Sequence, residues 1–110
     1  MYELWQTEWC PASRRVRQLL TELDIEYVNR QVPVARDDRV YLRERTGSDV
    51  IPLLVTPDGE HLIGESEIVA YLTAREPVPQ GARAHRLRAE KARRRFLEEE
   101  CECPPQPVTR

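Results

Sequence analysis

The sequence has little of what marks secreted or membrane-spanning proteins. Its 110 residues hold three cysteines, an odd number without the regular spacing of a disulfide framework, which favours a reducing compartment. The first residues contain neither a basic segment nor a long apolar run, and no stretch approaches the about 20 apolar residues of a membrane span. We therefore expect a cytoplasmic protein that does not associate with a membrane.

Groups of metal-binding residues are also scarce. Cys101 and Cys103 lie together in a Pro-rich end, but a structural zinc site usually needs four ligands and no further His or Cys lies nearby in sequence. His61 and His85 have no carboxylate or cysteine at a recognisable catalytic spacing, so we expect both at the surface. We expect no metal site, and an inert tail is favoured over one whose thiols resolve a mixed disulfide on another cysteine.

Charge is unevenly distributed along the chain. Residues 83–95 carry a net charge of +6 and residues 77–110 carry +3, which leaves −5 on residues 1–76 because the whole chain carries −2. A basic helix could bind RNA or an acidic partner, but no aromatic residues are interleaved before Phe96. We therefore expect a solvated helix face and no nucleic-acid binding, although docking on the acidic body is compatible with the charges.

The segment Trp9-Cys10-Pro11-Ala12-Ser13 is the most informative part of the sequence. It joins a strand predicted at residues 2–6 to a helix in which apolar residues repeat at helical spacing. Pro11 suits the first helical position, and the free amides and dipole there favour a thiolate at Cys10. Ser13 replaces the second cysteine of a C-x-x-C spacing, so Cys10 would need a soluble thiol or another cysteine to complete a cycle. The alternative is that Cys10 is a small buried hydrophobic residue.

The remaining pattern predicts an α/β fold. Strands are expected at residues 25–32, 51–56 and 61–63, with helices at 36–45 and from 64 to before Pro77. The order βαβ followed by ββα predicts one mixed four-stranded sheet with flanking helices. Residues 1–76 are expected to form this domain, followed in residues 77–110 by a linker, a charged helix at about 82–100 and a Pro-rich tail.

Three motifs in this order resemble one protein family over about residues 2–76. They are Trp9-Cys10-Pro11-Ala12-Ser13, then Thr46-Gly47 leading to Ile51-Pro52, then Gly64-Glu65-Ser66 opening a helix. The chain resembles a glutaredoxin or the thioredoxin-fold N-terminal domain of a glutathione S-transferase, which implies a thioredoxin-like fold.

The resemblance also implies a glutathione site. It implies that Ile51 pairs through its backbone with the cysteinyl part of glutathione, and that Pro52 follows a cis peptide bond and faces the nucleophile. Glu65 and Ser66 would receive the γ-glutamyl group, at a helix N-terminus whose N–H groups are free. From the residues alone, Pro52 could simply begin a strand and Ser66 could simply cap a helix.

The predicted function is a glutaredoxin-like monothiol oxidoreductase in which Cys10, supported by Pro11 and Ser13, acts on glutathione mixed disulfides. Glutathionylated proteins or small disulfides are the expected substrates, and glutathione is the expected cosubstrate. The excess of arginine over lysine indicates a GC-rich genome, and another low-molecular-weight thiol is the alternative cosubstrate. A non-catalytic binding module and an iron–sulfur cluster carrier are the alternative functions.

Two departures from the family pattern bear on activity. Thr7 stands where many glutaredoxins have lysine, and Glu8 adds a negative charge that opposes thiolate formation, which leaves the helix terminus and Arg14 or Arg15 to offset it. Only 34 residues follow Glu76, so we expect disulfide exchange rather than conjugation, which needs a large helical domain.

Overall fold

The computed structural model describes the backbone of residues 1–99 and the side chains of residues 1–95. Its elements are β1 (Tyr2–Gln6), α1 (Pro11–Glu22), β2 (Tyr27–Gln31), the 3-10 helix η1 (Arg36–Asp38), α2 (Val40–Thr46), β3 (Leu53–Val55), β4 (His61–Ile63), α3 (Glu65–Arg75) and α4 (Ala82–Glu99). The strands form one sheet in the order β2-β1-β3-β4, with β1 and β2 parallel and the other pairs antiparallel. This confirms the predicted thioredoxin-like fold.

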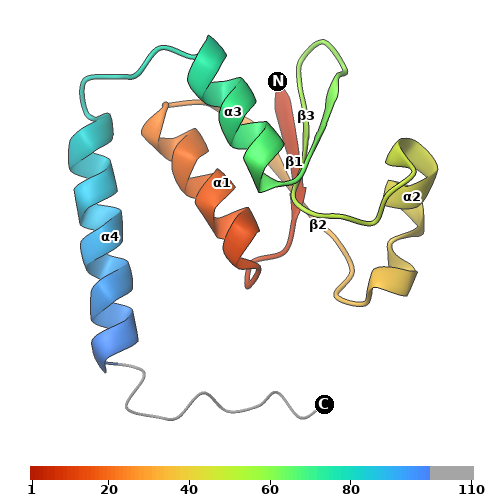
Figure 1. Ribbon diagram of the computed structural model, residues 1–110, viewed down its shortest axis with the longest axis horizontal. Helices are drawn as coiled ribbons and strands as arrows, with labels where there is room; N and C mark the ends of the chain where they lie inside the picture. Colours follow the sequence, from red (N-terminus) through yellow and green to blue (C-terminus); the bar gives the residue numbers. More distant parts are fainter. Residues whose placement is uncertain (100–110) are drawn as a thin grey trace.

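Alternation along the strands creates a core on each face of the sheet. Side chains of neighbouring strand residues point to opposite faces, so Leu54 packs toward α1 and α3 while Leu53 packs toward α2. The larger core contains Leu4, Val16, Leu20, Leu23, Leu54, Leu62, Ile68 and Leu72. Figure 1 shows α1 and α3 together over the sheet and α2 beyond its other side.

The helix predicted at residues 36–45 is divided into two pieces. The 3-10 turn ends at Asp38, Arg39 has a non-helical backbone, and α2 begins at Val40. Arg39 is 6% exposed, and its guanidinium donates hydrogen bonds to three backbone carbonyls, which a continuous helix would displace. The predicted stop at Gly47 is confirmed, because Gly47 takes the left-handed conformation with φ 75°.

Two predicted strands are shorter than expected. The strand predicted at 25–32 spans Tyr27–Gln31, and the one predicted at 51–56 spans Leu53–Val55. Pro52 has no N–H to donate to a neighbouring strand, so the ladder begins after it. The Pro52 carbonyl instead accepts a 2.9 Å hydrogen bond from the N–H of Gly64.

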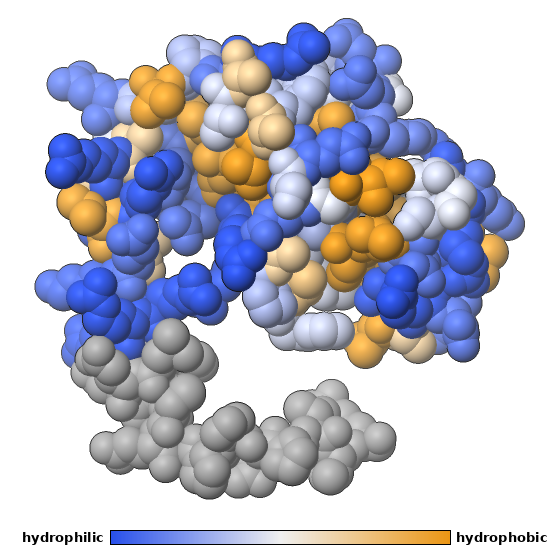
Figure 2. Space-filling view, viewed as in Figure 1, coloured by the Kyte–Doolittle hydropathy of each residue, from blue (hydrophilic) through white to orange (hydrophobic). Residues whose placement is uncertain are grey.

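The charged helix α4 docks on the body through α1. The side chain of Glu22 is 3% exposed and accepts hydrogen bonds from Arg86 at 3.1 Å and from Gln18 at 3.0 Å. Figure 1 shows α4 running alongside α1. On the face shown in Figure 2, hydrophilic atoms cover most of α4, and hydrophobic atoms gather between α3 and α2. The acidic body therefore receives the basic helix through a specific ion pair.

Some expectations fall outside the described residues. These are the end of the charged helix at Glu100 and the tail thiols Cys101 and Cys103. Within residues 1–99, no helix is both long enough and apolar enough to cross a membrane.

Candidate functional site

Cys10 lies at the junction that the sequence predicts. It is the N-cap residue of α1, with an extended backbone, and Pro11 follows as the first helical residue. The Cys10 carbonyl accepts the first helical hydrogen bond, from the N–H of Arg14 at 2.9 Å. Cys10 is half-buried, so its sulfur lies beside the unpaired amides of the first turn while remaining accessible.

The surroundings of Cys10 favour the thiolate. Burial raises the pKa of the Cys10 thiol, but hydrogen bonds from the Ser13 side chain and from the Ser13 and Ala12 backbone, together with the charge of Arg39, lower the pKa below its ordinary value. Ser13 is fully buried, and its hydroxyl forms no hydrogen bond with any described residue in this structure. That hydroxyl is therefore free to donate to the sulfur when the thiolate forms.

Arg39 is a buried charged residue beside Cys10 that the sequence does not single out. Its Nε donates to the Pro33 carbonyl at 2.9 Å, and its two Nη atoms donate to the carbonyls of Asp49 and Val34 at 3.1 Å. These bonds hold a buried cation near Cys10, and no carboxylate among the described residues forms an ion pair with it. Only the fold brings Arg39 to Cys10, so no local spacing signals it.

Of the two arginines expected to offset the charge of Glu8, Arg15 forms an ion pair with Glu65 and Arg14 is exposed. Arg15 donates to both carboxylate oxygens of Glu65, at 2.7 and 2.6 Å, although the charge of Cys10 also contributes to raising its pKa. Arg14 is exposed on α1. Glu8, expected to oppose the thiolate, is 3.7 Å from Arg17 and accepts a hydrogen bond from Gln6. Arg39 and Arg15 both interact with the charge of Cys10, and of these two Arg39 is the buried one.

A hollow of about 410 Å³ brings Cys10 and Ile51 together. Its lining residues are Trp9, Cys10, Val34, Arg36, Arg39, Val50 and Ile51. The bond between Ile51 and Pro52 is a cis peptide bond, and Pro52 is fully buried. Ile51 precedes β3, so its backbone N–H and C=O lie outside the ladders that pair β3 with β1 and β4.

Glu65 and Ser66 begin α3. Gly64, with φ 89°, is the N-cap residue, and no side chain caps the helix. Ser66 is therefore not the cap, and its side chain is exposed. The Glu65 carboxylate is bound to Arg15, which joins the start of α3 to α1. Neither Glu65 nor Ser66 lines the hollow that contains Cys10 and Ile51.

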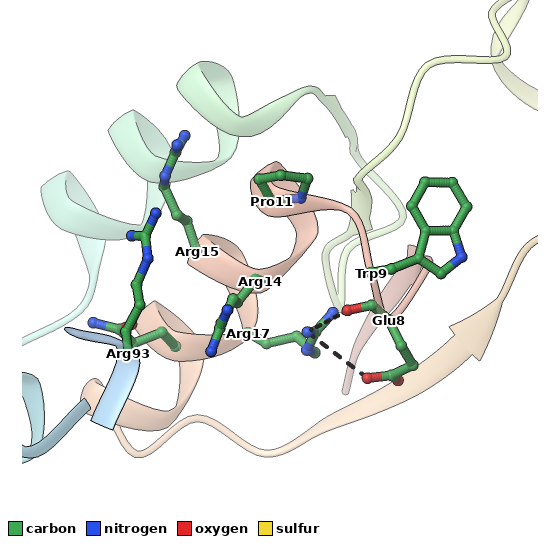
Figure 3. Close-up of a pocket in the computed structure, with 8 residues that line it drawn as sticks. Glu8, Trp9, Pro11, Arg14, Arg15, Arg17 and Arg93 are labelled. Carbon is green, nitrogen blue, oxygen red and sulfur yellow. Dashed lines mark hydrogen bonds and ion pairs between the residues drawn. The ribbon is translucent and has the colours of Figure 1, made fainter. Parts of the chain in front are cut away.

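A second hollow, of about 370 Å³, adjoins the first because Trp9 lines both. Its other lining residues are Glu8, Pro11, Arg14, Arg15, Arg17, Gln18 and Arg93. Figure 3 shows Arg14, Arg15 and Arg17 projecting from α1, with Arg93 contributed by α4. The sequence does not predict this hollow, because its basic residues come from two helices far apart in the chain.

The two histidines are half-buried rather than exposed. His61 lies on β4 opposite Val55, and His85 has its Nδ1 at 4.0 Å from Glu22. In the part of the chain that the structure describes, no group of three His, Cys, Asp or Glu residues could hold a metal ion.

Comparison with known proteins gives one family match. A family model described as the N-terminal domain of glutathione S-transferase matches residues 4–82. A search of curated proteins finds no match.

Several solved structures resemble the chain. A glutathione S-transferase from Methylobacillus flagellatus with glutathione bound is 32% identical, with a TM-score of 0.58, over 73% of this chain and 41% of that one. Glutaredoxin 2 from Salmonella typhimurium in complex with glutathione is 20% identical, with a TM-score of 0.61, over 70% and 35%. A glutathione S-transferase from Rhodospirillum rubrum is 22% identical, with a TM-score of 0.63, over 91% and 46%. The chain thus spans less than half the length of each of these three.

Proposed function

Because this chain belongs to the family of glutathione S-transferase N-terminal domains, we propose that it binds glutathione and that Cys10 exchanges thiols with glutathione mixed disulfides. The observation that supports this most directly is the position of Cys10. It combines a helix N-terminus, a lowered pKa and a hollow shared with Ile51. A cysteine that served only as a buried hydrophobic residue would need none of these.

The proposed reaction has two steps. The Cys10 thiolate attacks the glutathione sulfur of a mixed disulfide, the original S–S bond breaks, and the substrate thiolate leaves and takes a proton from solvent. Cys10 is then disulfide-bonded to glutathione. The thiolate of a second glutathione attacks the glutathione sulfur of that adduct, which releases oxidised glutathione and regenerates the Cys10 thiolate. Over the two steps, the substrate thiol is released in reduced form and one glutathione thiol is oxidised, its sulfur joining the glutathione of the mixed disulfide as oxidised glutathione.

Binding of the tripeptide would use backbone groups and a helix terminus. Ile51, whose backbone lies outside the β3 ladders, would pair with the cysteinyl part, and the cis bond to Pro52 would fix its orientation. The γ-glutamyl carboxylate would meet the free N–H groups of α3 and the exposed Ser66 hydroxyl. Glu65, already bound to Arg15, would accept the γ-glutamyl ammonium. The reducing cytoplasm is the compartment that this chemistry requires.

Turnover tests this proposal against a non-catalytic binding module. The assay measures reduction of the mixed disulfide of glutathione and 2-mercaptoethanol. The oxidised glutathione that forms is detected through glutathione reductase. We expect turnover by the wild type and none by Cys10→Ser, while calorimetry shows that both bind glutathione. Binding without wild-type turnover would contradict exchange and support the binding module. If turnover required a different low-molecular-weight thiol, that thiol would replace glutathione as the cosubstrate.

A further inference from the structure

The second hollow, between α1 and α4, is lined by four arginines: Arg14, Arg15, Arg17 and Arg93. It continues into a third hollow, of about 430 Å³, that shares Arg14, Arg17, Gln18 and Arg93 with it. Ala89 and Ala92 line this continuation from α4, and their small side chains leave the groove open. One end of the groove is at Trp9, next to Cys10 (Figure 3).

Two of the four arginines have partners. Arg15 is paired with Glu65 at 2.6 Å. Arg17 lies 3.7 Å from the Glu8 carboxylate, donates to the backbone carbonyls of Thr7 and Glu8 at 3.2 and 3.1 Å, and also donates to the Gln6 side chain. The Glu8 carboxylate, the acidic group of this hollow, also accepts a bond from Asn29 at 3.3 Å.

Arg14 and Arg93 have no ion pair or hydrogen bond with any described side chain. Each is exposed, and each lines both hollows of the groove. Cations facing one concave surface repel one another, and the potential they create attracts an anion to it. A guanidinium group offers paired N–H donors that match a carboxylate in geometry.

The remainder of the groove fits a small organic group. Trp9 is 63% exposed and lines both this groove and the hollow that contains Cys10. A volume of about 370 Å³ lies at the lower end of the range of small-molecule sites. A group attached to a sulfur at Cys10 could extend past Pro11, which also lines the groove, and place an acidic end near Arg14 and Arg93.

We propose that this groove binds the anionic end of the second substrate, so that the protein prefers glutathione mixed disulfides whose other half is a small carboxylate-bearing thiol. This inference rests on the proposed function, since glutathione must occupy the neighbouring hollow. Arg14 and Arg93 are specificity-determining residues that contact the carboxylate.

A matched pair of unreactive thioethers tests this inference. S-(2-carboxyethyl)glutathione and S-(2-carbamoylethyl)glutathione have nearly the same shape and differ in one negative charge. By calorimetry at low salt, we expect the wild type to bind the acid roughly tenfold more tightly than the amide. The preference should shrink in Arg14→Gln and in Arg93→Gln and disappear in the double variant, because the acid loses more affinity than the amide. It should also weaken at about 0.5 M salt because screening shortens the reach of the charges.

Arg88→Gln is the control variant. Arg88 lies on α4 but is not among the residues lining either hollow, so its loss changes net charge without changing the groove. We expect it to retain the preference for the acid. Equal binding of the two thioethers by the wild type would overturn this inference and leave the glutathione site intact. A preference that survives the double variant, or that Arg88→Gln abolishes, would overturn the assignment to Arg14 and Arg93. Binding of neither thioether would overturn the proposed function and this inference with it.

Discussion

Ser13 occupies the position at which a dithiol site has its second cysteine, and its buried hydroxyl is placed to donate to a Cys10 thiolate, which lowers the pKa of Cys10. The residue therefore replaces a resolving thiol with a hydrogen-bond donor. Its role is predictable in part, because the sequence shows that the second thiol is missing. The burial of the hydroxyl and its freedom to donate to sulfur depend on the packing around α1.

Ser13→Ala should raise the pKa of Cys10, because the side-chain donor to the thiolate is lost. We expect alkylation by iodoacetamide near pH 6 to slow by roughly two- to tenfold, the effect of one hydrogen bond. The full pH dependence of the rate should shift to higher pH. An unshifted profile would contradict the role given to Ser13.

Ser66→Ala should weaken glutathione binding without changing the reactivity of the Cys10 thiol. The Ser66 side chain is exposed and caps no helix, so the fold should be unaffected. Loss of one donor to a carboxylate should weaken glutathione binding by roughly tenfold in calorimetry. The alkylation rate of Cys10 serves as the control and should not change. Unchanged affinity would remove Ser66 from the proposed site.

At the scale of elements, the break between η1 and α2 positions a buried charge. Sequence periodicity predicts one helix at residues 36–45 and finds its end at Gly47 correctly. It misses the interruption at Arg39, because the carbonyls that Arg39 binds belong to Pro33, Val34 and Asp49 in the flanking loops. Local patterns contain no signal for such contacts.

Arg39→Met should weaken both the fold and the site. It leaves buried carbonyls without their donors, which should cost about 2–3 kcal/mol in the free energy of unfolding measured with urea. It should also raise the pKa of Cys10, since a nearby positive charge is removed. Arg36→Gln is the comparison, because it loses only an exposed ion pair with Asp49 and should have little effect. Similar stability losses in both variants would contradict a special role for Arg39.

Docking of α4 on α1 should depend on pH through Glu22. Burial alone raises the pKa of Glu22, but hydrogen bonds from Arg86 and Gln18 and the charges of Arg86 and His85 outweigh it and lower the pKa. The folded state therefore favours the ionised form. Ionised Glu22 therefore stabilises the fold. This stabilisation is complete above the unfolded-state pKa of about 4.3 and is lost as the pH falls through the lower folded-state pKa.

Glu22→Gln tests this docking. The neutral amide should lower the free energy of unfolding by about 1 kcal/mol at pH 7, and the difference from wild type should diminish toward pH 3 as the wild-type carboxyl gains its proton. Thermal unfolding at both pH values measures it. A difference that does not depend on pH would show that the charge of Glu22 does not contribute to holding α4.

At the scale of the whole molecule, the sequence predicts the structural features that are formed by residues close together along the chain. The strand–Cys10–helix junction, the order of the elements and the start of α3 are of this kind, and the structure confirms each. The approach of Arg39 to Cys10 and the groove that Arg14 and Arg93 share join distant segments. Their formation depends on how the helices pack on the sheet, which periodicity does not specify.

The most direct test of the account is the intact mass of the protein after incubation with oxidised glutathione, with peptide mapping to separate Cys10 from Cys101 and Cys103. We predict one glutathione adduct at Cys10, removed by fresh glutathione, and no adduct at that position in Cys10→Ser. Absence of an adduct at Cys10, or labelling of Cys101 and Cys103 alone, would contradict Cys10 as the nucleophile of a glutathione site.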